Sequence, residues 1–238
     1  MTQALLKETS VDLGDKRVPV RLYRNTRARR LILRIDSQRD GADGVAVTLP
    51  RATSQREGLE MVLDKADWVL ANLGGLEPRV PFADGERVPL GGVDHLIRHT
   101  PYVAGGVWRE NGEIFVTGKP EHLARRLGDW LKAEAKRRIG PLARDKAMIL
   151  GRPAGRISIR DTKSRWGSCS LEGNLSFCWR LVLAPETVLD YVVAHEVGHL
   201  AELNHGPKFW RAVAELTADM NGAKKWLRLN GEKLHRYG

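Results

Sequence analysis

The segment from Pro185 to about Leu203 is apolar on nearly every side of the helix that its spacing predicts. Its apolar positions are Val188, Leu189, Val192, Val193, Val197, Leu200 and Leu203. A helix of this kind is stable only when the rest of the protein covers it. Polar side chains within it need partners, because an unpaired polar group is costly to bury. This requirement singles out His195, Glu196 and His199.

The two histidines stand four residues apart, so helical geometry places their imidazoles on one face, about 5.4 Å apart along the axis. Ring nitrogens with that spacing reach a single zinc ion at about 2.0–2.1 Å. Glu196 lies about 100° around the helix, beside the metal, where a carboxylate can accept a proton from an activated water. The pattern predicts a hydrolytic site with one zinc ion per chain.

The third metal ligand is expected from the residues that follow this helix. The helix is predicted to stop at Asn204, and Pro207 opens an amphipathic helix that continues through Met220. His205 then lies in a turn that can fold back toward the metal. Glu202 is the alternative, but it lies two turns from His195 in the same straight helix, about 10 Å along the axis. We favour His205, which leaves the fourth zinc position open.

Two segments resemble a known family. Residues 195–199 with 205–210, and Lys163 to Ser170, are similar to the two signatures of the YgjP-like branch of the SprT-like zinc metallopeptidases. A looser similarity through 30–49 and 65–68 extends over most of the chain. The resemblance implies a zinc peptidase with a zincin-type catalytic half. It also implies zinc ligands at His195, His199 and His205 and a catalytic acid/base at Glu196.

The predicted fold class is α+β with two halves. Residues 1–118 are interpreted as a β-rich amino-terminal domain with one helix over about 54–73. Residues 119–238 are interpreted as a zincin-like domain: a helix, a short antiparallel sheet over 156–183, the active-site helix and a following helix. Pro141 is expected to break the first of these helices, with a further helical piece to about residue 150.

Other residues are weaker candidates for roles at the site. Arg165, Tyr191 and His235 are possible oxyanion donors or substrate contacts, although a surface or packing role fits each equally with the sequence. The hairpin over 165–183 is the candidate strand edge for an extended substrate. Trp166 and Trp210 flank the site in the sequence and suit either its walls or the core.

The formal charge of +10 is concentrated in one place. Residues 119–165 carry a net charge of +9, and the segments on either side are close to neutral. Such a pattern is typical of a solvated helix face. It could also attract a nucleic acid, an acidic protein or a phosphate-bearing substrate. Aromatic residues are sparse within it, so stacking of single-stranded bases is poorly supported.

Composition excludes several other classes of protein. The sequence has no apolar run of about 18 residues and no secretory signal pattern, which predicts a cytoplasmic protein without a membrane partner. Cys169 and Cys178 form no disulfide framework or metal-finger pattern. If Gly173 and Asn174 form a two-residue turn, the two cysteines lie opposite each other as reduced thiols. The oligomeric state stays open.

Three functions are compatible with these patterns. The leading hypothesis is a zinc-dependent peptidase that acts on a peptide or protein substrate. The second is a metal-dependent nucleotide phosphohydrolase in which the basic segment 119–165 holds the nucleotide. The third is a nucleic-acid-associated module in which zinc is structural.

Overall fold

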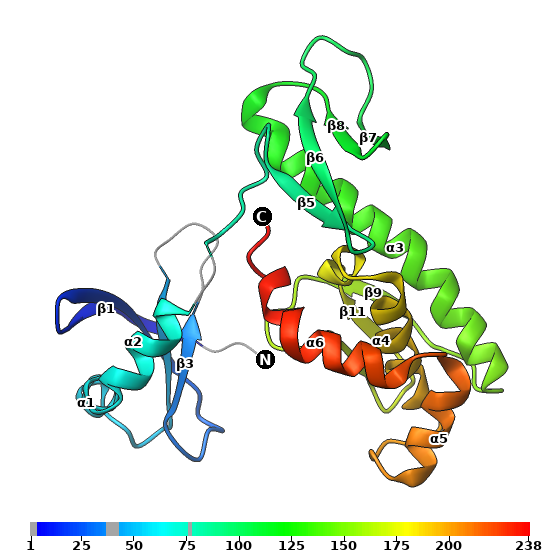
Figure 1. The fold of residues 1–238 in the computed structure, drawn as a ribbon. Coiled ribbons are helices and arrows are strands. Elements are labelled where there is room, and N and C mark those ends of the chain that lie inside the picture. Colours follow the sequence, from blue (N-terminus) through cyan, green and yellow to red (C-terminus); the bar gives the residue numbers. More distant parts are fainter. Residues whose placement is uncertain (1–3, 37–42, 76–77) are drawn as a thin grey trace. The chain divides into compact units, whose positions relative to one another are not determined.

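The structure, a computed structural model, describes residues 4–36, 43–75 and 78–238. The chain divides into two compact units, Met1–Glu77 and Pro78–Gly238. Both contain helices and strands, which confirms the predicted α+β class (Figure 1). Among the described residues, no helix combines the length and apolar character needed to cross a bilayer.

The first unit is a four-stranded sheet with two helices. Its strands are β1 (Ala4–Leu13), β2 (Lys16–Arg24), β3 (Ile32–Asp36) and β4 (Gly44–Leu49), in the order β1-β2-β4-β3. The pairing is antiparallel except between β2 and β4, which run parallel. The last three strands coincide with residues 18–23, 31–36 and 45–49, whose apolar patterns predict strands, whereas β1 was not predicted. Buried valines and leucines of β2 and β4 form the core together with Val62 and Val69 of the helices.

The predicted helix over 54–73 is two helices, α1 (Gln55–Asp64) and α2 (Ala66–Gly74), which meet at Lys65. Ser54 followed three residues later by Glu57 is the sequence pattern of a capping box, and the structure has this box at the start of α1. The Ser54 hydroxyl accepts a hydrogen bond from the Glu57 amide at 3.2 Å, and the Glu57 carboxylate accepts one from the Ser54 amide at 2.7 Å.

The second unit begins with a four-stranded sheet. Its strands are β5 (Arg87–Leu90), β6 (Val93–His99), β7 (Val107–Glu110) and β8 (Glu113–Val116), in the order β5-β6-β8-β7. The dipeptide Asn111-Gly112 favours a two-residue hairpin turn, and it forms the β7–β8 turn with φ angles of 48° and 78°. The amides of Gly91 and Gly92 donate to the carbonyls of Val182 and Leu183 at 2.8 and 3.0 Å. These long-range bonds tie the sheet to the rest of the second unit. The compact units divide after residue 77, whereas the sequence analysis divided the chain at residue 118.

Helix α3 (Leu123–Ile149) is continuous, and the prediction that Pro141 breaks it is wrong. Its buried stripe continues past the proline, from Leu131, Ala135 and Ile139 to Ala143 and Ala147. Packing of this stripe against the core compensates for the backbone hydrogen bond that a proline cannot make. α3 packs against α4 (Glu186–Gly198) and against the short helix η2 (Trp179–Leu183), where the sequence analysis had expected strand.

A three-stranded sheet follows, formed by β9 (Ile157–Arg160), β10 (Gly167–Cys169) and β11 (Leu175–Cys178) in the order β10-β11-β9. The sheet is mixed, because β11 pairs antiparallel with β10 but parallel with β9. Cys169 pairs with Leu175, so its predicted position opposite Cys178 is wrong: the connection is longer than a two-residue turn. Both cysteines are free thiols.

Three helices complete the second unit: α4 (Glu186–Gly198), α5 (Pro207–Leu216) and α6 (Met220–Leu234). α4 is the predicted buried helix, and it ends at Gly198, six residues before the predicted stop at Asn204. α6 was not predicted. It packs against α4, as do α3, α5 and β10 (Figure 1).

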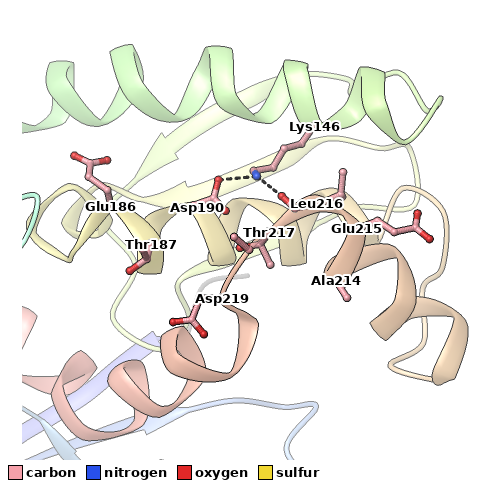
Figure 2. A pocket seen from close by; sticks show the side chains of 10 residues that line it. Lys146, Glu186, Thr187, Asp190, Ala214, Glu215, Leu216, Thr217 and Asp219 are labelled. Carbon is pink, nitrogen blue, oxygen red and sulfur yellow. Dashed lines mark hydrogen bonds and ion pairs between the residues drawn. The ribbon is translucent and has the colours of Figure 1, made fainter.

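A buried lysine joins three of these helices. Lys146 of α3 forms an ion pair with Asp190 of α4 at 2.6 Å and donates a hydrogen bond to the carbonyl of Leu216, the last residue of α5 (Figure 2). Only 8% of the Lys146 side chain is exposed. The ammonium therefore fixes α4 relative to the C-terminal end of α5, which helps to place the residues that follow α4 against it.

We expect Lys146→Met to lower the free energy of unfolding by about 1.5–3 kcal/mol, since it removes charge-assisted hydrogen bonds from a buried site. Urea denaturation of the full chain measures the change. Lys136→Met, on the same helix but exposed, is the matched control and should change stability by less than about 0.5 kcal/mol. Equal effects of the two substitutions would show that the buried contacts do not stabilise the helices.

Candidate metal centre

Three histidines converge at the end of α4. His195 lies in the last turn of the helix, His199 is its C-terminal cap, and His205 lies in the turn before α5. Each offers one ring nitrogen, and these atoms lie within 4.8 Å of one another. The Nε2 atoms of His195 and His205 are 3.1 Å apart. The early end of α4 allows the chain to turn back, so His205 reaches the other two histidines.

The carboxylate of Glu202, the alternative third ligand, is not part of this group of described residues. Its backbone carbonyl instead lies 3.1 Å from Nδ1 of His199. A carbonyl accepts a hydrogen bond only, so His199 carries its proton on Nδ1 and presents Nε2 with a free lone pair. Glu202 thus orients a ligand nitrogen through its main chain.

His195 is oriented in a similar way from within its own helix. The hydroxyl of Tyr191 lies 3.5 Å from Nδ1 of His195, on the side away from His205. Tyr191 is 6% exposed. Burial and the charge of Glu196 raise the pKa of its phenol to about 12. The phenol stays neutral and partners the outer nitrogen of His195, which leaves Nε2 facing the cluster.

The histidines are kept in the form that binds metals. Burial lowers the pKa of His195 to about 4, and the neighbouring His199, His205 and Lys224 contribute in the same direction. Burial also lowers the pKa of His199. At neutral pH these imidazoles are uncharged, and neutral imidazole is the ligand form for zinc.

Two aromatic side chains from α5, Phe209 and Trp210, pack against the three histidines. The Phe209 ring contacts all three histidine rings, with centroid distances between 4.5 and 5.0 Å. The Trp210 ring lies 5.6 Å from His205 and 5.7 Å from His195, so it is a wall of the site. Gly198 allows this close approach, since a Cβ there would lie 2.9 Å from Val213 and 3.2 Å from Phe209.

Glu196 is buried beside the cluster, with 7% of its surface exposed. Burial raises its pKa to about 7, and the positive charge of Arg165 acts against this shift. The backbone of β10 lies directly over its side chain. A Cβ on Gly167 would lie 2.5 Å from Cγ and 2.6 Å from Oε1 of Glu196. Sequence reasoning missed Gly167 as a site residue, although it stands inside the second signature segment.

The three weaker candidates take different places. Arg165 is exposed and close enough to act on the Glu196 carboxylate. Tyr191 faces the outer side of His195. His235 stacks on Trp166 with 4.8 Å between ring centroids, and within the described part of the chain its buried Nδ1 has no hydrogen-bond partner. The structure therefore brings Arg165 and Tyr191 to the site and places His235 beside Trp166.

A pocket of about 650 Å³ lies on another side of α4, next to the Lys146–Asp190 ion pair (Figure 2). Its lining includes the carboxylates of Glu186, Glu215 and Asp219. The three histidines do not line it, so this pocket is separate from the metal centre. Two of these carboxylates have structural partners: Glu186 pairs with Arg138, and Asp219 caps α6 through the amide of Gly222.

Some basic side chains of the segment form ion pairs within their own helix, although the segment keeps its net positive charge. Arg125 and Lys132 pair with Asp129, and Arg137 pairs with Glu134. These are exposed pairs three or four residues apart, as expected for a solvated helix face. Binding of nucleic acid or of an acidic protein to residues 119–165 stays a prediction.

Comparison with known proteins gives one family and one related structure. Residues 29–230 match the family described as YgjP-like, metallopeptidase domain. A solved structure, the crystal structure of the metallopeptidase zymogen of Pyrococcus abyssi abylysin, is 26% identical with a TM-score of 0.35. The similarity covers 42% of this chain and 97% of that one. No curated protein matches the sequence.

We expect Tyr191→Phe to weaken zinc binding by about tenfold, because phenylalanine keeps the packing but removes the hydroxyl that orients His195. Competition with a chromophoric zinc chelator measures the affinity. Tyr102→Phe removes a hydroxyl from a fully exposed residue and serves as the control. Equal zinc affinity in the two variants would contradict the orienting role of Tyr191.

Proposed function

The chain belongs to the YgjP-like metallopeptidase family, and on this premise we propose that it is a zinc-dependent peptidase with Glu196 as general base and acid. The observation that carries the proposal is the convergence of three histidine nitrogens within 4.8 Å beside a buried glutamate. Neutral imidazoles provide the ligands, and the carboxylate provides a group that can take up and release a proton.

The donor set fits zinc. Nitrogens at about 2.0–2.1 Å from a tetrahedral ion are about 3.3 Å apart, and the Nε2 atoms of His195 and His205 are 3.1 Å apart. We infer that His195, His199 and His205 hold one ion per chain. When bound, zinc supplies a Lewis acid that makes water nucleophilic near neutral pH.

The environment of Glu196 suits proton transfer in both directions. Its pKa of about 7 is close to neutral pH, where a carboxylate can both accept and donate a proton. Glu196 takes the proton from the attacking water and returns it to the departing amine. Arg165 favours the ionised form that begins the cycle, since its charge lowers the pKa of Glu196.

The proposed substrate platform is β10. This strand lies at the edge of its sheet, with β11 on one side, and it packs against α4. An extended peptide can add to such an edge through main-chain hydrogen bonds. Of the three candidate oxyanion donors, Arg165 is the best placed, because it is exposed and acts on Glu196, whereas Tyr191 partners His195.

The site favours peptide hydrolysis over the two alternative functions. A buried carboxylate beside the triad has a direct role in peptide hydrolysis, and a purely structural zinc has no use for it. Arg125, Lys132 and Arg137 of α3 form ion pairs on the helix surface, as expected for a solvated helix face. Cytoplasmic location and the identity of the substrate stay predictions.

The decisive test is Glu196→Gln. We expect this variant to retain about one zinc ion per chain and to lose hydrolysis by about 10²–10⁴-fold, because glutamine cannot accept the proton. Zinc content is measured by elemental analysis, and activity is measured on a peptide library and on nucleoside triphosphates. Peptide cleavage at the wild-type rate would overturn the proposal. Triphosphate hydrolysis lost in the variant would favour the phosphohydrolase instead.

Gly167→Ala tests the contact between β10 and Glu196. The new methyl group must displace the carboxylate, so we expect kcat/KM for a cleaved peptide to fall about 10–100-fold while zinc content is retained. Gly106→Ala is the control, because a Cβ there would meet open space. Full activity of Gly167→Ala would show that the position of Glu196 does not depend on this glycine.

A further inference from the structure

A lysine from α6 lies against the wall of the metal centre. Nζ of Lys224 is 3.5 Å from the centroid of the Trp210 ring. That ring stacks on His205 with an interplanar angle of 27° and also contacts His195. One indole ring therefore contacts both the ammonium and two of the proposed zinc ligands.

Lys224 has an unusual setting for a lysine of this protein. Among the described residues it forms no ion pair with a carboxylate, whereas lysines and arginines of α3 pair with Asp129 and Glu134. It is half-buried, and burial lowers its pKa. The neighbouring Lys225 is exposed. A partly buried cation without a partner anion is costly, and the Trp210 ring offsets only part of that cost.

Arg165 is a second cation near Glu196. Arg165 is exposed, acts on Glu196, and forms no ion pair with any described residue. Arg165 precedes Gly167 by two residues, and Gly167 lies against the Glu196 side chain, whereas Lys224 lies on the ring that stacks on His205. Arg165 and Lys224 are both positive, although a positive charge opposes the binding of a metal cation. An anion in the cleft would offset this repulsion.

We propose that Lys224 binds a carboxylate of the substrate and that Arg165 strengthens the positive field, so that the enzyme selects peptides with a carboxylate near the scissile bond. The carboxylate has two possible sources, an aspartate or glutamate side chain or the free C-terminus of the peptide. The inference rests on the proposed peptidase function. A purely structural Lys224, which only covers Trp210, would affect stability and not the preference for charge.

The test uses ligands that bind zinc without being cleaved. Three pairs of peptide hydroxamates are compared, and the two members of each pair differ only in a carboxylate or a carboxamide. The first pair has aspartate or asparagine before the hydroxamate, and the second has the same two residues after it. The third pair has a free or an amidated C-terminus after the hydroxamate. Calorimetry on the zinc-loaded full chain gives each Kd. We expect the carboxylate member of at least one pair to bind about tenfold more tightly. The preference should shrink between about 0.05 and 0.5 M salt.

Variants then assign the preference to Lys224. Lys224→Met should reduce it to less than about twofold, Lys224→Arg should restore most of it, and Lys225→Met should leave it unchanged. Thermal unfolding confirms that each variant is folded. If the hydroxamates bind without any charge preference, or if the preference survives Lys224→Met, the inference about Lys224 is overturned but the peptidase proposal is not. A zinc-loaded protein that binds none of the hydroxamates would overturn the peptidase proposal together with it.

Discussion

The second unit is organised around the burial of α4. This helix has apolar side chains on nearly every side, and α3, α5, α6, β10 and β11 all pack against it. Burial of apolar surface stabilises the arrangement, but it also removes three ionisable side chains of α4 from water. The three side chains are accommodated in different ways. Asp190 forms an ion pair with Lys146, His195 lies with two other histidines, and the pKa of Glu196 is raised. The chemistry of the centre is thus a consequence of the packing.

Features that depend on local geometry could be predicted from the sequence. Two histidines four residues apart lie on one helix face in any α-helix, and the capping box and the Asn111–Gly112 turn depend on neighbouring residues alone. The position of His205 in a turn could also be predicted from the sequence, because the residues after it indicate the start of a new helix. The three-histidine geometry required only that the chain turn back between α4 and α5.

Features that depend on long-range packing could not be predicted. Pro141 is tolerated because a buried stripe extends across it, and the unit boundary after residue 77 reflects hydrogen bonds from Gly91 and Gly92 to η2. The register of β10 and β11 depends on the length of the connection between them. Gly167 and Lys224 belong to the same class. Gly167 contacts Glu196, and Lys224 contacts Trp210. In both cases the contact joins segments that are well separated in the chain.

The contact at Gly167 couples two parts of the proposed reaction mechanically. No side chain separates the backbone of β10 from the Glu196 carboxylate, so the strand forms one wall of the space in which that carboxylate can move. A peptide that adds to the edge of β10 would tighten or shift this wall. The conformational freedom of the proton-transferring group would then depend on whether the strand edge is occupied. Binding along the strand and readiness for proton transfer would be a single event.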